Sequence, residues 1–145
     1  MNKYTIFIFA ILLLFAGSVA QARDTRHQFN IADVVDKPQN ASQLEGVSFY
    51  FGDQEHPSVK NDFGEFRTNK KTNAFNKSDA EACQWVMMSA LLQLHKRARD
   101  LGADAVINIK SNYKNNVVSS DTQYTCGAGM TVAGVALIGT LVKLE

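Results

Sequence analysis

The chain has 145 residues, of which 46% are hydrophobic and 20% charged, and its 15 Lys and Arg residues nearly balance its 14 Asp and Glu residues. This length predicts one small domain. The near-neutral balance argues against a nucleic-acid-binding protein, because such binding depends on cationic side chains that neutralise phosphates, and it offers no strong attraction to anionic lipid.

Residues 1–22 have the three parts of a secretory signal peptide. A lysine supplies the positive start, residues 4–15 form the apolar segment, and Ala20-Gln21-Ala22 is an A-x-A cleavage site. The alternative is an uncleaved membrane anchor, but the apolar run is shorter than the ~18–20 residues that span a bilayer. We therefore expect cleavage between Ala22 and Arg23. No cysteine follows the apolar segment, so we expect a periplasmic or secreted protein without a lipoprotein anchor or stable membrane insertion.

Residues 23–44 are predicted to be a flexible N-terminal segment that precedes the domain proper at 45–145. The segment is polar except for the patch at 29–35, and Pro38 would end any element that forms there. A flexible start, one short element and a loop are therefore expected before the domain begins.

Two strands are predicted next. Residues 47–51 alternate apolar and polar side chains and are bounded by Gly46 and Gly52, which is typical of a strand with one buried face. Residues 63–68 form a second short candidate strand, in which Gly64 indicates a bulge or a close backbone approach. The polar loop that follows carries Phe75, which we expect to be buried or pinned near the helix start.

A long helix is predicted from Ser78 to Leu101. Ser78 and Glu81 have the spacing of a capping box, in which each side chain satisfies a backbone amide of the first turn. Gly102 stands where a left-handed C-terminal cap is favoured. Both ends of the helix are therefore specified by local sequence.

The helix has an apolar stripe and a flanking apolar facet. At about 100° per residue, the stripe that should face a sheet consists of Cys83, Met87, Ala90, Leu91, Leu94, Ala98 and Leu101. The facet consists of Trp85, Met88 and Leu92, and we expect it to meet a loop or another subunit. Core packing is favoured over a binding surface for the Met and Trp side chains.

The C-terminal third is predicted to be mostly strand. Residues 105–109 form a short apolar run after the glycine stop, residues 110–122 are a polar turn region, and residues 124–145 form one long or two shorter strands. The fold class is therefore α+β: a single domain with a small, mainly antiparallel sheet packed against one long helix, in the order β-β-α-β-β.

The two cysteines, Cys83 and Cys126, are most simply a disulfide in an exported protein. It would tie the first turn of the helix to the last strand region. A redox-active pair is disfavoured because the spacing is not C-x-x-C.

Residues with catalytic or metal-binding potential are scattered. His27, His56 and His95 are not spaced as metal ligands usually are. The glycines at 127 and 129 do not continue into a phosphate-binding motif. We therefore predict no catalytic residue, no metal site and no cofactor.

The motif A-x-x-L-G-A-D-A-V, at Ala98 to Val106, resembles the small YbjQ-type domains called heavy-metal-binding and the periplasmic domain of RcsF-type envelope-stress sensors. The segment Cys126-Gly127-Ala128 is similar to the cysteine that leads into the last strand of those sensors. The resemblance covers about Glu45 to Leu144. It implies an α/β sandwich, disulfides and envelope proteins as partners, and YbjQ-type domains also imply a homo-oligomer. The chain departs from the sensors in having two cysteines instead of four and no lipid-bearing cysteine.

We expect a soluble periplasmic protein-interaction module without catalytic activity. The resemblance to RcsF-type sensors implies a component of the envelope-stress response. The alternative is a periplasmic protein that binds a small ligand or a metal. An enzyme is the third class, and no motif in the sequence proposes its reaction.

Overall fold

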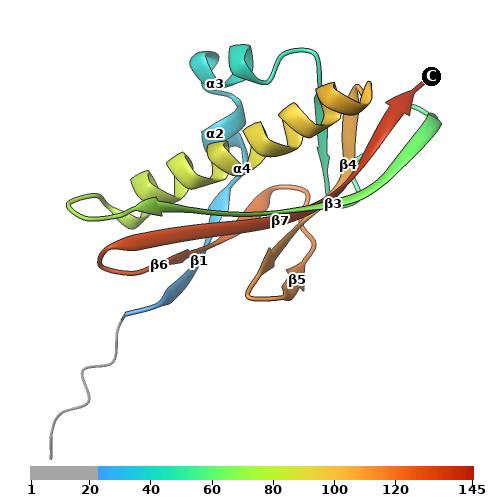
Figure 1. Cartoon of the computed structure of the whole chain (residues 1–145). Helices are drawn as coiled ribbons and strands as arrows, with labels where there is room; N and C mark the ends of the chain where they lie inside the picture. The colour runs from blue at the N-terminus through green and yellow to red at the C-terminus, as the bar shows by residue number, and fades with distance from the viewer. Residues whose placement is uncertain (1–22) are drawn as a thin grey trace, which may run out of the picture.

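The computed structural model describes residues 23–145, so the predicted signal peptide and Ala22 lie outside the described residues. A long helix lies across a curled sheet, and two short helices lie beside it (Figure 1). In chain order the elements are β1 (Thr25–Asn30), α2 (Ala32–Val35), α3 (Pro38–Gln43), β2 (Ser48–Phe51), β3 (Val59–Asn73), α4 (Asp79–Leu101), β4 (Ala105–Tyr113), β5 (Asn116–Val118), β6 (Gln123–Ala128) and β7 (Val132–Leu144).

The sheet is mixed and larger than predicted. Its seven strands follow the order β1-β6-β7-β4-β2, with β3 along the other side of β7 and β5 on β4. Every pair is antiparallel except β2 with β4. The α+β class and the antiparallel majority are therefore confirmed, whereas the simple β-β-α-β-β order is wrong because β1, β5 and a separate β6 also join the sheet.

The helix α4 has the predicted ends. The Ser78 hydroxyl accepts a hydrogen bond from the Glu81 amide at 3.1 Å, and Gly102 has the left-handed φ of 77° that caps the C-terminus. The predicted stripe faces the sheet and is buried from Cys83 to Ala98, with Leu101 half-buried. This stripe packs on β3, β6 and β7 and forms the centre of the core.

The flanking facet of α4 is divided. Met88 is buried and Leu92 is half-buried, but the Trp85 side chain is 64% exposed. The core interpretation was therefore wrong for Trp85, because α2 and α3 cover only part of this side of the helix. Phe75, expected to be buried or pinned near the helix start, is not buried, because its side chain is 60% exposed. In this turn between β3 and α4 the neighbouring Ala74 is the residue buried in the core.

The segment 23–44 is built into the fold, which corrects the expectation of a flexible segment. Strand β1 pairs with β6 along its whole length, with His27 opposite Cys126. Ile31 and Val34 are buried in the core next to α4. The physical reason is that the pairing partner of β1 lies about a hundred residues further along the chain, so no local pattern announces it.

Two other segments are more regular than the sequence predicts. Strand β3 runs well beyond the predicted 63–68, with the expected irregularity at Gly64, where the register with β7 shifts. The polar region 110–122 was expected to be a turn, but β4 continues through it to Tyr113 and forms a hairpin with β5. Strand β5 is exposed along its length, whereas Ser111 of β4 is buried and its hydroxyl accepts a hydrogen bond from the Thr125 backbone N–H at 2.8 Å.

Candidate functional site

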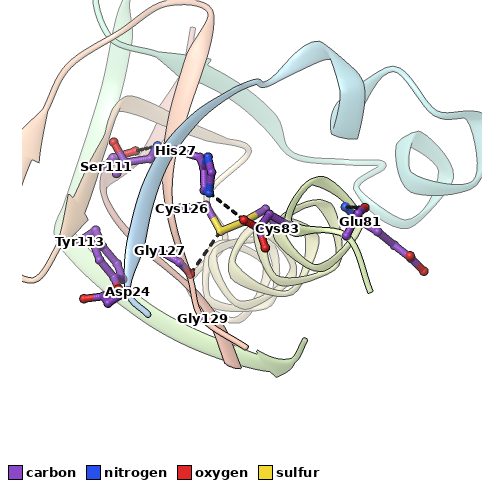
Figure 2. The surroundings of a disulfide bond; sticks show 12 residues. Asp24, His27, Glu81, Cys83, Ser111, Tyr113, Cys126, Gly127 and Gly129 are labelled. Atoms are coloured by element: carbon purple, nitrogen blue, oxygen red, sulfur yellow. Dashed lines mark hydrogen bonds and ion pairs between the residues drawn. A yellow bond between two sulfur atoms is a disulfide. The ribbon is translucent and has the colours of Figure 1, made fainter. Parts of the chain in front are cut away.

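The predicted disulfide is present between α4 and β6. Cys83 and Cys126 are bonded, with their Cα atoms 5.9 Å apart, and both side chains are fully buried (Figure 2). Cys126 lies in β6, one strand before the last. Because thiol–disulfide exchange needs access to a sulfur atom, this burial indicates a structural cross-link rather than an exchange site.

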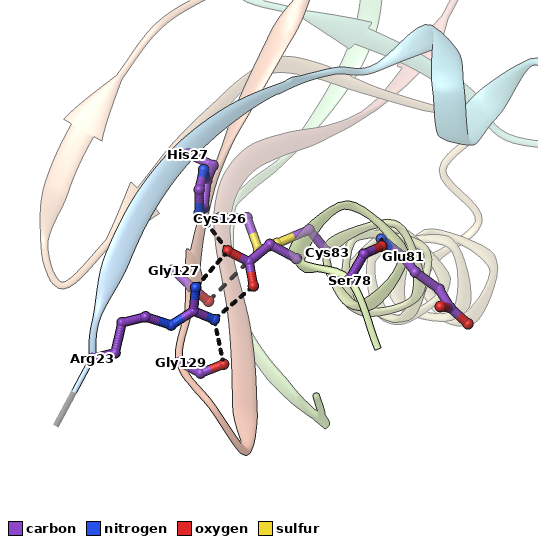
Figure 3. Close-up of polar contacts among 9 residues, drawn as sticks. Arg23, His27, Ser78, Glu81, Cys83, Cys126, Gly127 and Gly129 are labelled. Carbon is purple, nitrogen blue, oxygen red and sulfur yellow. Dashed lines mark hydrogen bonds and ion pairs between the residues drawn. A yellow bond between two sulfur atoms is a disulfide. The ribbon is translucent and has the colours of Figure 1, made fainter. Parts of the chain in front are cut away.

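A polar cluster lies beside the disulfide at the N-terminus of α4. The Arg23 guanidinium donates to both carboxylate oxygens of Asp79, at 3.1 and 2.8 Å, and to the Gly129 carbonyl at 3.0 Å (Figure 3). His27 Nε2 lies 2.9 Å from the same carboxylate. The hydrogen bonds from Arg23, with a smaller contribution from His27, hold the pKa of Asp79 below its usual value. The cluster anchors the start of β1 onto the helix, so Arg23, the expected first residue after cleavage, has a structural contact.

The three histidines lie in different parts of the domain. His27 is on β1, the ring of His56 is hydrogen-bonded to the Pro57 carbonyl at 2.8 Å, and His95 Nε2 is 2.9 Å from the Glu45 carbonyl. Across residues 23–145, no three His, Cys, Asp or Glu side chains come close enough together to hold a metal ion. The structure therefore brings together the two predicted cysteines but none of the histidines.

An open groove of about 1090 Å³ runs along β2. Its lining also includes α2 and the turn after α3, Asp121 and Thr122 before β6, and Leu144 and Glu145 at the end of β7. The floor is β2 itself, with the half-buried rings of Phe49 and Tyr50. We call this the β2 groove.

The charged side chains that line the β2 groove are all acidic. They are Asp36, Glu45, Asp104, Asp121 and Glu145, and no Lys, Arg or His is among the lining residues. The Asp104 carboxylate accepts from the Leu144 amide at 2.9 Å and pairs with Lys143 at 2.9 Å, and these contacts lower its pKa, the amide most. The Asp36 and Glu45 carboxylates have neither a hydrogen bond nor an ion pair within residues 23–145. The lining is therefore acidic, and these two of its five carboxylates have no direct partner within residues 23–145.

The floor of the groove is also a free sheet edge. Strand β2 ends the strand order, with β4 on one side of it and the groove on the other. Ser48 N–H donates to the Asp104 carbonyl, and Gly52 N–H donates to the Ile109 carbonyl, both at 2.9 Å. Because backbone groups alternate in direction along a strand, those of Phe49 point into the groove. An exposed strand edge is a template for pairing with another chain.

Sequence reasoning identified β2 but missed the groove. Its carboxylates come from positions 36, 45, 104, 121 and 145, so only the folded chain brings them together. The one local signal is that Asp36, Glu45, Asp53 and Glu55 surround the predicted strand with only one Lys or Arg, Lys37, among them. The lining offers carboxylates, backbone groups and aromatic rings, which suit binding.

Comparison with known proteins does not assign this chain to a family. No protein-family model matches the chain, and no curated protein matches it. One similar solved structure is a protein of unknown function of the DUF74 family from Pediococcus pentosaceus, with 15% sequence identity and a TM-score of 0.45, covering 70% of this chain and 100% of that one. None of the helices between Arg23 and Glu145 has the length and apolar content that crossing a membrane requires.

Proposed function

We propose that this protein is an exported, non-catalytic protein-interaction module and that the β2 groove is its docking surface. The observation that carries the proposal is the free edge of β2, set in a groove whose charged side chains are all carboxylates. An enzyme active site usually has a nucleophile next to a general base in a pocket. The lining of the β2 groove contains no Ser-His or Cys-His pair of this kind.

Two features support an exported location. The first 22 residues have the pattern of a cleavable signal, and the only two cysteines of the chain form a buried disulfide. Disulfides persist in oxidising compartments such as the periplasm and are rare in the cytosol. On this proposal the partners are envelope proteins, and the resemblance to RcsF-type sensors favours a role in the response to envelope stress.

A small-ligand-binding protein is the second candidate. The groove volume of about 1090 Å³ lies close to the ~300–1,000 Å³ typical of small-molecule sites. Such sites usually enclose most of the ligand, whereas this groove is open along a strand edge, which suits a chain better than a small molecule. Native mass spectrometry of the exported protein separates the two, because a bound small ligand would appear as a discrete mass added to the chain.

The proposal is tested by affinity capture that compares two variants of equal charge. The full chain is expressed with its own first 22 residues, purified from the exported fraction, immobilised and exposed to envelope extract. The groove variant carries Asp36→Lys and Glu45→Lys, whose side chains have no partner to lose, and the control variant carries Glu65→Lys and Asp100→Lys on exposed sites away from the groove. We expect wild type and control to retain a protein that the groove variant loses. Identical profiles from all three would contradict the proposal.

A further inference from the structure

We propose that the occupant of the β2 groove is an extended segment of a partner protein that bears Lys or Arg and adds as a strand to the free edge of β2. This inference rests on the proposed docking function of the groove and names the chemistry of the partner. It depends on the backbone of one residue, Phe49, and on the charge around it.

The backbone of β2 leaves one open pairing position. Ser48 and Gly52 donate toward β4, so Phe49 and Phe51 present their backbone groups to the opposite side. The backbone groups of Phe51 are already paired on that side. Its N–H donates to the side-chain Oε1 of Gln54 at 2.8 Å, and its carbonyl accepts from the backbone N–H of Gln54 at 3.1 Å. Gln54 therefore occupies the place of a neighbouring strand at one end of the edge. Phe49 remains as the position where an incoming chain can exchange both backbone hydrogen bonds.

The charge of the groove selects the partner. The exposed carboxylates of Asp36, Glu45 and Asp121 flank the edge, and Lys143, which lies next to the lining, is engaged with Asp104. A strand alternates its side chains between two faces, so an incoming segment can hold apolar side chains against the aromatic floor and cations toward the rim. Complementary charge gives specificity and a faster association rate.

Pairing between two copies through this edge is disfavoured by the same charges. A two-fold interface brings the same surface of both copies together, so the groove carboxylates of one copy would face those of the other. Like charges juxtaposed across an interface cost affinity. The occupant is therefore a segment of a different chain, and self-association through the groove is an outcome that the test must detect.

The experiment uses defined peptides and the full exported chain. The probe is a short fluorescent peptide of alternating Lys and Val. One matched peptide replaces each Lys by Glu, and another replaces two Val residues by Pro, which removes backbone donors. We expect the Lys peptide to bind about tenfold or more tightly than either matched peptide, and the Asp36→Lys/Glu45→Lys variant to lose about tenfold in affinity while the Glu65→Lys/Asp100→Lys control does not.

Amide hydrogen exchange locates the peptide without relying on any variant. The Phe49 amide should exchange more slowly when the Lys peptide is bound, whereas the Ser48 amide, already bonded to the Asp104 carbonyl, should change little. Equal affinity for the Lys and Glu peptides, or unchanged exchange at Phe49, would overturn the inference. Groove-dependent dimerisation in light scattering would also overturn it. If envelope capture still depends on the groove while the peptides fail, the docking function stands and only the partner chemistry is wrong.

Discussion

The ring of Tyr113 occupies the space that a side chain on Gly127 would need. A Cβ built on Gly127 would overlap that ring, and the Tyr113 hydroxyl donates to Asp24 Oδ1 at 3.0 Å. Burial, followed by the hydrogen bond to Asp24, raises the pKa of Tyr113. The ring thus fixes the end of β4 against β6 and the chain just before β1, which closes the curl of the sheet.

Gly127→Ala should therefore destabilise the protein, because the ring of Tyr113 must move and the hydrogen bond from Tyr113 to Asp24 is lost. We expect a loss of about 1–3 kcal/mol in the free energy of unfolding, measured by urea denaturation. Gly134→Ala is the matched control: Gly134 pairs with Gly127 across β6 and β7, yet its Cβ would meet the same ring at an ordinary 3.5 Å. Equal losses for both variants would show that the ring is not the cause.

Removing the disulfide should lower stability without abolishing the fold. The bond closes a loop with a sequence separation of 43 residues. In the chain-entropy account such a loop contributes up to about 4 kcal/mol. A domain of this size loses roughly 3–6 °C per kcal/mol, so the Cys83→Ser/Cys126→Ser protein should melt at a lower temperature, by up to roughly 12–24 °C. Calorimetry measures this, and mass spectrometry of the non-reduced wild type checks the bond. Two free thiols in the exported wild type would contradict the structure.

The stability contributed by Asp104 should depend on pH in a stated direction. Its pKa is lowered from the usual 3.8 by the Leu144 amide and Lys143, so its charged form is favoured in the folded state. Its contribution is therefore fully present above about pH 3.8 and is lost as the pH falls through the lower folded value. We expect Asp104→Asn to cost no more than about 1 kcal/mol at neutral pH, because water screens this partly exposed pair. The difference should vanish in acid. A cost of the same size at both pH values would contradict this.

Residues that are adjacent in sequence explain most of what could be predicted. The hydrogen bond between Ser78 and Glu81 and the left-handed Gly102 involve neighbours within one turn, so their spacing specifies them. The pairing of β1 with β6 is different. In this pairing His27 lies opposite Cys126, and it forms only in the complete sheet. The polar sequence of residues 23–44 contains no local pattern that predicts it.

Local periodicity also does not determine which apolar side chains of α4 are covered in the fold. This can be tested with two variants of the helix. Periodicity placed Met87 and Trp85 near the apolar side of α4, but only Met87 is fully buried, whereas Trp85 is 64% exposed. Met87→Ala should cost about 2–5 kcal/mol, and Trp85→Ala should change the free energy of unfolding by less than about 0.5 kcal/mol. Similar losses for both, measured by chemical denaturation, would indicate that Trp85 is covered in solution, for example by another copy.

The β2 groove was beyond sequence reasoning for a physical reason. Val47 to Phe51 predicted a strand, but an edge is defined by the absence of a neighbour, which only the strand order reveals. The carboxylates of Asp36 and Glu45 belong to no motif in the sequence. They form an acidic lining only together with Asp121 and Glu145, which the fold brings to the same groove from distant positions in the chain.

Site-specific photo-crosslinking from Ser48 tests the docking function of the β2 groove most directly. Ser48 is exposed and lines the groove, and Asn69 on β3 is an exposed control site outside it. With a photoreactive residue at each position of the full chain in living cells, we predict a discrete adduct from position 48 that is absent from position 69 and is lost when Asp36→Lys and Glu45→Lys are added. No adduct from position 48, or the same adducts from both positions, would contradict the account.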